Sequence, residues 1–273
     1  MRLSLAQIAS GDDKARNLAL IRASVERARD EGADLVVFPE YAMYEKRAVD
    51  ETFATAAEPL DGPFVSALGE IAQASGVTVV AGVVEKSEDD PRPYNTMVAV
   101  GTTGSLLARY RKIHLFDSFG FRESEWIAPS GSLAPVVFES AGVTVGLMTC
   151  YDLRFPELGR RLADAGAQLV LACSSWVPGD GKVDQWRTLA KARAIENTYF
   201  VAAVSQAPPV SIGSSMLVDP FGRVLRELGD ASAIATIDVD ADDVATARDR
   251  NPALQHRRFS VQPLAEGSGG AGR

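Results

Sequence analysis

The sequence predicts an α/β fold in which two β-sheets are covered by helices. Its 273 residues are 46% hydrophobic, which is enough apolar material for one large core. Apolar runs of strand length alternate with longer segments that show helical periodicity. The strand runs are almost continuously apolar, which is typical of sheets covered on both faces.

No linker rich in Pro, Gly or Ser divides the chain before its end. We therefore expect one domain over residues 1–263. Residues 264–273 consist mostly of Gly, Ala and Ser and cannot bury a core. They are predicted to form a flexible C-terminal tail.

The first half of the chain opens with a strand and a capped helix. Polar and apolar residues alternate over Arg2–Ile8, a pattern that indicates a strand. Asp12 and Asp13 can cap the helix that follows, and Gly32 would end it. The other elements predicted in this half are a strand at Asp34–Phe38, a helix at Pro63–Ala74, a strand at Val77–Val84 and a hairpin formed by Thr96–Val100 and Leu106–Arg111.

The second half repeats this alternation of strands and helices. A tight turn at Asp219–Gly222, which contains Pro and Gly, predicts a second hairpin. The elements predicted here are strands at Val136–Phe138, Val143–Met148, Leu169–Cys173, Thr198–Val204, Ser215–Val218 and Val224–Glu227, with helices at Glu157–Ala165 and Val183–Ile195.

Two short segments resemble ligand-binding loops only superficially. Asp238–Asp243 has Asp at the sixth position, where a calcium loop needs Gly, so a strand end followed by a helix cap is favoured. Gly179–Lys182 lacks the upstream Gly and the following Ser or Thr of a phosphate-binding loop. We interpret that segment as an ordinary loop.

The chain contains one internal similarity. Arg29–Val37 resembles Ala163–Leu171 at an offset of 134 residues. Two similar half-units would explain it. Chance would also explain it, because Gly-Ala followed by aliphatic residues is a common junction between a helix and a strand.

Charge and composition exclude several classes of function. The chain has 28 basic and 36 acidic residues, a net charge of −8, which disfavours nucleic acid and anionic membranes as partners. No apolar run has the length of a signal or membrane-spanning segment, so a cytoplasmic protein is expected. Two cysteines and two histidines are too few for a disulfide scaffold or a zinc site rich in Cys and His.

Three reactive side chains follow predicted strands. Glu40, Lys112 and Cys150 each come at the carboxyl end of an apolar run, the edge at which ligands bind in covered α/β sheets. A cysteine attacks a carbonyl as the thiolate, so it needs a base and positive charge near the developing oxyanion. If the three side chains converge, they provide that chemistry.

Other interpretations of these residues remain open. Cys150 could be a small buried hydrophobe, an interpretation that fits Cys173 well. A Cys-His pair could instead recruit His114 or His256. His114 lies two residues after Lys112, so in extended chain the two side chains would face the same way.

Three segments resemble, in order, the signature segments of the nitrilase superfamily of carbon–nitrogen hydrolases. They are Leu35–Tyr41, Tyr110–Asp117 and Leu147–Leu158. The resemblance continues through Ala192–Asn197 and Asp219–Gly222 to about residue 258, so it leaves out only the tail. It implies a single-domain, four-layer α-β-β-α sandwich that usually dimerises into a longer layered assembly, with no metal and no organic cofactor.

The resemblance also implies roles for individual residues. Glu40 would be the general base, Lys112 the cation that stabilises the oxyanion, and Cys150 the nucleophile that forms a thioester. Glu123 matches an additional active-site glutamate, and the backbone N–H of Tyr151 would assist Lys112. A catalytically idle interaction protein on the same scaffold is the alternative from a different class.

Within the superfamily the chain resembles the Nit-type amidases. Phe116–Ser124 is more similar to bacterial deaminated glutathione amidases than to omega-amidases, so a terminal primary amide on a small carboxylate-bearing compound is the expected substrate. An omega-amidase and an N-carbamoyl amino acid hydrolase remain alternatives. Arg154 and Trp176 are candidate substrate-binding residues, although Arg154 could pair with Asp152 or Glu157 and Trp176 could be packing.

A homodimer is also expected. In this superfamily the outer helices commonly pack face to face. The helix that follows Arg154 offers an apolar stripe for such a contact, formed by Leu158, Leu162 and Ala165.

Overall fold

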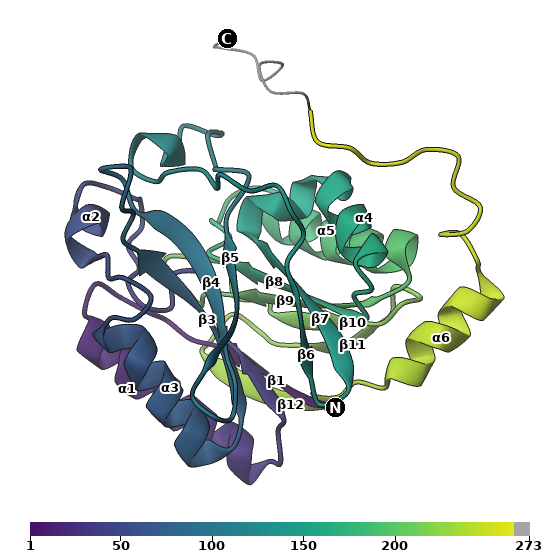
Figure 1. Ribbon diagram of the computed structural model, residues 1–273, viewed down its shortest axis with the longest axis horizontal. Coiled ribbons are helices and arrows are strands. Elements are labelled where there is room, and N and C mark those ends of the chain that lie inside the picture. Colours follow the sequence, from purple (N-terminus) through teal and green to yellow (C-terminus); the bar gives the residue numbers. More distant parts are fainter. Residues whose placement is uncertain (265–273) are drawn as a thin grey trace.

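The computed structural model describes residues 1–264 and contains two six-stranded sheets that face each other (Figure 1). In spatial order, the first sheet consists of β12 (Ala233–Asp238), β1 (Arg2–Gln7), β2 (Leu35–Val37), β3 (Thr78–Glu85), β4 (Tyr94–Val100) and β5 (Leu106–Arg111). The second sheet consists of β11 (Val224–Glu227), β10 (Met216–Val218), β9 (Phe200–Ser205), β8 (Leu169–Ser174), β7 (Val143–Thr149) and β6 (Val137–Ser140).

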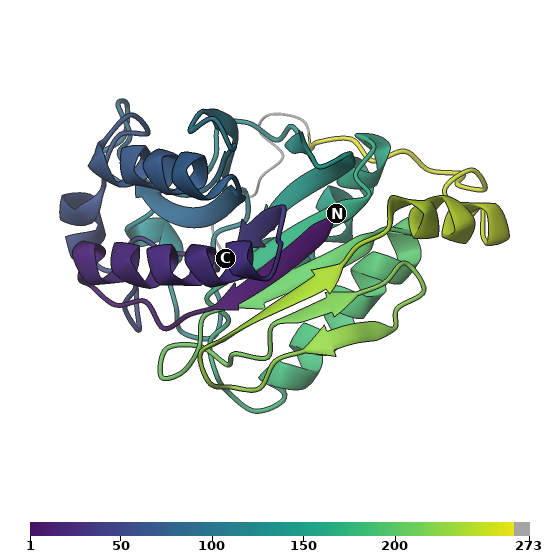
Figure 2. The same cartoon turned by 90° about the horizontal axis from the view of Figure 1, so that it is seen from below.

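Helices cover the outer faces of both sheets. Figure 2 shows α1 and α3 side by side over the first sheet, whereas α4 and α5 lie against the second sheet. The helices are α1 (Lys14–Asp30), α2 (Thr52–Ala56), α3 (Pro63–Ser75), α4 (Pro156–Asp164), α5 (Lys182–Asn197) and α6 (Ala241–Arg250), with short 3-10 turns η1 (Glu123–Glu125) and η2 (Cys150–Arg154). The predicted α-β-β-α sandwich is confirmed.

Local signals in the sequence explain where these helices begin and end. The Asp13 carboxylate accepts hydrogen bonds from the backbone N–H groups of Ala15 and Arg16 and so caps α1. The carboxylate of Asp240 likewise caps α6, as expected for a strand end followed by a helix cap. Gly76 ends α3 in the left-handed conformation at φ 70°.

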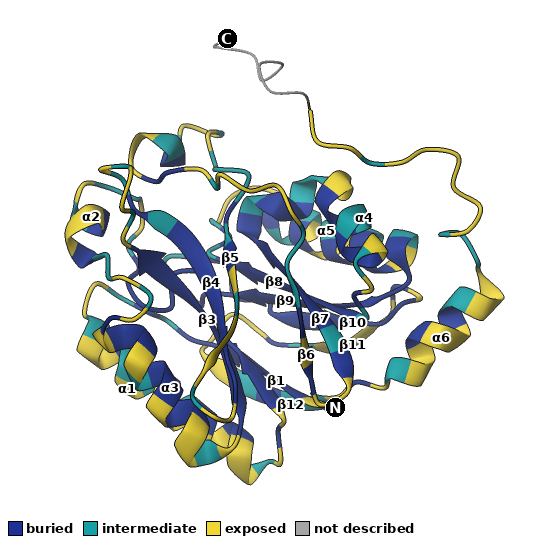
Figure 3. Cartoon of the chain, viewed as in Figure 1, coloured by how far each residue is buried: buried dark blue, intermediate teal, exposed yellow. Residues whose placement is uncertain are grey.

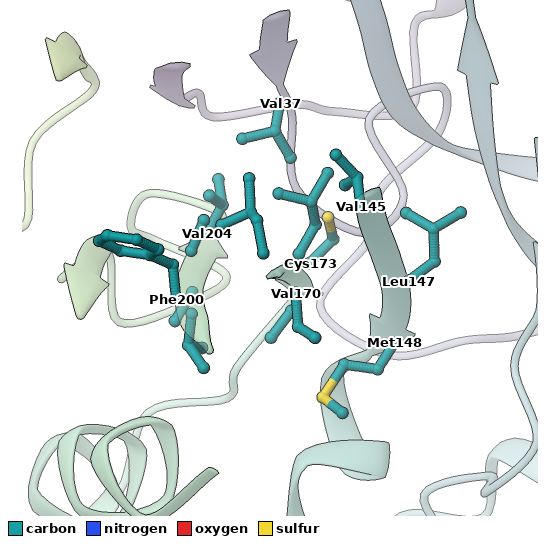
Figure 4. Close-up of a cluster of buried hydrophobic side chains, with 14 of the residues drawn as sticks. Val37, Val145, Leu147, Met148, Val170, Cys173, Phe200 and Val204 are labelled. Atoms are coloured by element: carbon teal, nitrogen blue, oxygen red, sulfur yellow. The ribbon is translucent and has the colours of Figure 1, made fainter. Parts of the chain in front are cut away.

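The inner faces of the two sheets form one apolar core. Figure 3 shows that the central strands of both sheets are almost entirely buried, whereas the edge strands β5, β11 and β12 and the outward sides of the helices carry exposed residues. Val37 of the first sheet faces Val145 and Cys173 of the second, whereas Val170 points to the other side of β8, the side covered by α4 (Figure 4). Cys173 is therefore a buried core residue, as the sequence suggested.

The two halves of the chain share one topology. In each half, the first strand pairs parallel with the second, the second pairs parallel with the third, and two antiparallel strands follow. An antiparallel strand completes each sheet beside its first strand, β12 against β1 and β6 against β7. The similar segments Arg29–Val37 and Ala163–Leu171 occupy the same helix-to-strand junction in the two halves. This shared topology favours two similar half-units over chance.

The apolar stripe on α4 that was expected to form a dimer contact is buried within its own chain. Leu158 and Leu162 are 4% and 0% exposed because they pack into the core of their own chain. The apolar stripe is therefore not available to a partner. The homodimer stays a prediction that rests on the family resemblance alone.

The remaining features predicted from the sequence are the lack of a membrane-spanning segment and a flexible C-terminal tail. None of the helices within residues 1–264 is long and apolar enough to cross a membrane. The predicted tail, residues 264–273, lies outside the described residues except for Leu264.

Candidate active site

The structure brings the predicted catalytic side chains to one cavity. Glu40 follows β2, Lys112 follows β5 and Cys150 follows β7, and the carboxyl ends of these strands converge between the two sheets. The cavity has a volume of about 360 Å³ and is lined by Glu40, Lys112, Glu123 and Cys150 together. A pocket of this size accommodates a small organic substrate.

Cys150 adopts a strained backbone conformation. Its φ of 49° lies in the left-handed region, which a residue with a side chain rarely occupies. Asp152 supports the turn by accepting hydrogen bonds from the Thr149 N–H at 3.0 Å and the Tyr110 hydroxyl at 2.6 Å. Strain of this kind clusters at functional sites. The turn leaves the Cys150 Sγ at the cavity, 3.9 Å from the carbonyl oxygen of Ser175.

Glu40 is held by a close approach of two backbone segments. A Cβ atom added to Gly82 of β3 would lie 2.4 Å from the Tyr41 nitrogen, so only glycine permits the turn that carries Glu40. The backbone N–H of Ser175 donates to Glu40 Oε2 at 2.6 Å. The Gln206 side chain donates to the Glu40 carbonyl at 3.0 Å. The carboxylate is therefore fixed from the second sheet as well as from the first.

Lys112 bridges two carboxylates. Its Nζ lies 2.9 Å from Glu40 Oε1 and 2.8 Å from Glu123 Oε2, and all three side chains are at least 95% buried. Asn95 donates to Glu40 at 2.7 Å and to Glu123 at 3.1 Å. Glu123 also accepts from the Tyr41 hydroxyl at 2.9 Å. The network leaves each of the three charged groups with a single orientation.

The charges set the protonation states of this network. Burial alone would lower the pKa of Lys112, but the Glu123 and Glu40 charges hold it well above its ordinary value. Burial would raise the pKa of Glu123, but the charge of Lys112 and its hydrogen bond keep it below that of a free glutamate. Lys112 is therefore a cation and Glu123 an anion at neutral pH.

Cys150 rests as a thiol. Burial, and next the negative charge of Glu40, raise the pKa of Cys150 well above its ordinary value, although the Lys112 charge acts in the opposite direction. A thiol in this state needs a base at the moment of attack.

Sequence reasoning missed several residues of the site. Asn95 and Tyr41 join the charged network, but a polar residue within a strand and a tyrosine after a turn carry no distinctive sequence signal. Glu45 lines the same cavity at 4% exposure, and its Oε2 accepts no hydrogen bond within residues 1–264. Burial, and next the negative charge of Glu40, raise the pKa of Glu45 well above its ordinary value.

The raised pKa of Glu45 predicts a pH-dependent loss of stability. Between the ordinary glutamate pKa and the raised value, the unfolded chain releases this proton and the folded chain keeps it. The free energy of unfolding of the wild type should therefore fall relative to Glu45→Gln as the pH rises from the ordinary glutamate pKa towards the raised one, by at most about 1.4 kcal/mol per pH unit. Urea unfolding at several pH values measures this, and parallel curves for the two proteins would contradict it.

His114 does not face Cys150. Its Nδ1 lies 2.6 Å from Asp152 Oδ1, and its ring stacks on Phe155 with centroids 3.7 Å apart. The expectation that His114 would share the direction of Lys112 is wrong because the chain leaves its strand at Arg111. His256 lies exposed beyond α6. Neither histidine lines a cavity that contains Cys150.

His114→Asn is therefore expected to retain activity within about tenfold of the wild type, because the amide can still bond to Asp152. Steady-state ammonia release from an amide substrate is the measurement. A loss of about a thousandfold or more, which is expected when a general base is removed, would support the Cys-His arrangement.

A second, smaller cavity adjoins the first at Cys150. Its volume is about 20 Å³, and its lining includes the candidate substrate-binding residues Arg154 and Trp176 together with Tyr151, whose backbone N–H was expected to assist Lys112. The predicted ion pair of Arg154 with Asp152 or Glu157 is absent from residues 1–264. Arg154 Nη2 instead donates to the Gln185 side chain at 2.7 Å, because Asp152 is engaged by Tyr110 and His114.

Trp176 both packs in the core and lines the smaller cavity. It is 4% exposed, its ring lies 5.2 Å from that of Trp186, and it lines the smaller cavity. Its Nε1–H donates to the carbonyl of Lys182 at 3.0 Å. Lys182 was expected in an ordinary loop, but it is the first residue of α5 and lines the same cavity.

No metal centre accompanies these side chains in the described chain. Within residues 1–264, no group of three or more His, Cys, Asp or Glu side chains is arranged to hold a metal ion. The chemistry of the cavity is that of a thiol, an ammonium and carboxyl groups.

Proteins of similar sequence align with this protein over nearly the whole chain. Hydrolase Rv0480c of Mycobacterium tuberculosis is 41% identical over 278 residues, covering 96% of this chain and 97% of that protein. The deaminated glutathione amidase of Escherichia coli O157:H7 is 31% identical and covers 91% of this chain and 94% of its own. Omega-amidase NIT2 of Mus musculus is 33% identical, with 95% and 96% covered.

Solved structures and a family model agree with these relatives. A mutant amidase from Nesterenkonia sp. AN1 has a TM-score of 0.81 at 29% identity, with 94% of each chain covered. That structure shows covalent addition of the acetamide moiety of fluoroacetamide at the active-site cysteine of that amidase. The family model described as carbon-nitrogen hydrolase matches residues 2–249, so the chain belongs to the carbon-nitrogen hydrolase family.

Proposed function

We propose that this protein hydrolyses the terminal primary amide of a small carboxylate-bearing compound to the acid and ammonia through a thioester on Cys150. The observation that carries the proposal is the meeting of Glu40, Lys112 and Cys150 at one cavity of about 360 Å³. A nucleophile, a base and a fixed cation at one cavity are what acyl transfer requires.

In the first step the Glu40 carboxylate takes the proton of the Cys150 thiol as Sγ attacks the amide carbon. The raised pKa of Cys150 supports a role for a base at that moment, and the fixed position of Glu40 suits it. Glu40 then gives the proton to the nitrogen as the C–N bond breaks. Ammonia leaves and the acyl group remains on Cys150.

Lys112 stabilises the oxyanion that forms during the attack. Its pKa, raised by Glu123 and Glu40 against the effect of burial, keeps it charged throughout the cycle. The backbone N–H of Tyr151 is the second proposed donor. Glu123 acts as a positioning residue, because its carboxylate fixes the Lys112 ammonium at 2.8 Å.

Water completes the cycle. Glu40 takes a proton from a water molecule as the water oxygen attacks the thioester carbon, and it returns a proton to the Cys150 sulfur as the C–S bond breaks. The product is the carboxylic acid, and the thiol and carboxylate are restored.

The preferred substrate is proposed to be deaminated glutathione or a close analogue. The similarity of Phe116–Ser124 to deaminated glutathione amidases supports this, and Arg154 beside Cys150 supplies a cation for a carboxylate. An omega-amidase acting on α-ketoglutaramate is the second candidate, which the similarity to omega-amidase NIT2 supports.

A side-by-side kinetic comparison tests the proposed function. Ammonia release is measured with deaminated glutathione, α-ketoglutaramate, an N-carbamoyl amino acid and an aliphatic nitrile. We expect the two carboxylate-bearing amides to have the highest kcat/KM. A tenfold preference for the carbamoyl compound or the nitrile would overturn the proposed substrate class. The absence of ammonia release from all four would favour a catalytically idle interaction protein.

Arg154→Lys is expected to lower kcat/KM for an anionic amide about tenfold more than for a neutral amide of similar length. The planar guanidinium can donate two parallel hydrogen bonds to a carboxylate, and lysine keeps the charge but loses that geometry. Paired kinetics on one enzyme preparation measure the effect. Equal losses for both amides would assign Arg154 a structural role.

A further inference from the structure

Lys182 is a buried cation without an acidic partner. Its residue exposure is 7%, yet its ammonium forms no ion pair with any carboxylate of residues 1–264. The Nζ instead lies 3.8 Å from the centroid of the Phe119 ring. A charge that is removed from water without a counter-charge costs free energy, so a group on the enzyme or on its ligand is expected to compensate it.

Arg154 is a second cation in the same place. Its guanidinium carbon lies 5.1 Å from the centroid of Trp176, and the Lys182 Nζ lies 5.8 Å from the same centroid. Its buried Nε has no hydrogen-bond partner within the described residues. Burial, and next the positive charge of Arg154, lower the pKa of Lys182, as two neighbouring cations would.

Both cations line the small cavity that opens on Cys150. The protein as a whole carries a net charge of −8, so two neighbouring cations without acidic partners are not a consequence of its composition. The buried Trp176 ring, which lines this cavity, lies beside the Arg154 guanidinium, and the exposed Phe119 ring lies over the Lys182 ammonium. This is a site for an anion rather than a surface salt-bridge cluster.

We propose that Lys182 and Arg154 together form a carboxylate-binding subsite that selects amides with an acid group distant from the reacting carbonyl. The inference rests on the proposed function and adds a specificity-determining residue to it. The Arg154 guanidinium and the Lys182 ammonium bind one carboxylate between them. Burial of Lys182 and Trp176 lowers the effective dielectric constant around the subsite, which strengthens the contact between the ammonium and a bound carboxylate.

The test compares a dicarboxylic acid monoamide, glutaramate, with an uncharged amide of similar length, hexanamide. Lys182→Met removes the charge and keeps an unbranched apolar side chain. We expect kcat/KM for glutaramate to fall about 10- to 100-fold, mainly through KM, because a hydrogen bond to a charged group is lost. The loss for hexanamide should be at least tenfold smaller. Lys191→Met, which removes an exposed lysine from the same helix, is the control.

A double variant tests whether the two cations share one ligand. If Lys182 and Arg154 bind the same carboxylate, the effects of Lys182→Met and Arg154→Met on glutaramate will not add. Additive effects would show two separate sites. Equal losses of kcat/KM for glutaramate and hexanamide in Lys182→Met, or no loss for either, would overturn the proposal.

A binding experiment separates this inference from the proposed function. Calorimetric titration of Cys150→Ala with glutarate reports on the subsite without turnover, and Lys182→Met in that background is expected to weaken binding about tenfold or more. Unchanged glutarate affinity overturns the subsite even if the enzyme is an amidase. Weakened affinity in a protein that releases no ammonia from any amide supports the subsite and refutes the proposed reaction.

Discussion

Cys150→Ala should lower kcat for any amide substrate by about 10⁴-fold or more and leave the fold intact. Among residues 1–264, the Cys150 thiol is the only cysteine sulfur that lines the cavity, and alanine has the same Cβ, so it adds no strain to the turn at φ 49°. Ammonia release gives the rate, and thermal unfolding checks the fold. A variant that retains activity within tenfold would place the nucleophile elsewhere.

Cys173→Ala is the matched control for this result. Cys173 is fully buried between the sheets, so its loss is expected to cost stability of about 1 kcal/mol and little activity. A comparable loss of turnover in a folded Cys173→Ala protein would contradict the assignment of Cys150.

Glu40→Gln should lower kcat about 10³-fold while Cys150 stays reactive toward a haloacetamide. The amide of glutamine cannot carry the proton, which both the acylation and the hydrolysis step need. The negative charge of Glu40 is one of the causes that raise the pKa of Cys150, so its removal favours the thiolate. Turnover and alkylation rates on the same preparation measure the two effects.

Glu45→Gln is the control for Glu40→Gln, since it makes the same chemical change in the same cavity. The raised pKa of Glu45 favours its uncharged form, so the Glu45→Gln variant is expected to keep turnover within about tenfold of the wild type. If Glu40→Gln keeps turnover and Glu45→Gln loses it, Glu45 is the base.

The fold could be predicted because its signals are local. The Asp13 cap, the Gly32 stop and the apolar runs each act within a few residues, and the helices and strands follow them. Pairing of β12 with β1, more than 200 residues apart in sequence, has no local signal. The short helix α2 was also missed, because five residues are too few for a periodic pattern.

The same distinction between local signals and distant packing applies to the residues of the candidate site. Glu40, Lys112 and Cys150 end predicted strands, so their sequence context indicated them. Lys182 and Glu45 depend on packing between distant elements, and the sequence context of a lysine in a loop does not show that it is buried. Leu162 shows the converse, because an apolar stripe fits a partner surface and the chain's own core equally well.

Acid-quench mass spectrometry of the wild-type protein during amide turnover tests the central claim most directly. We expect a covalent adduct on Cys150 that increases the protein mass by the mass of the substrate minus ammonia. No such adduct is expected in Cys150→Ala. An adduct that keeps the amide nitrogen, an adduct on another residue, or ammonia release that continues unchanged in Cys150→Ala would contradict it.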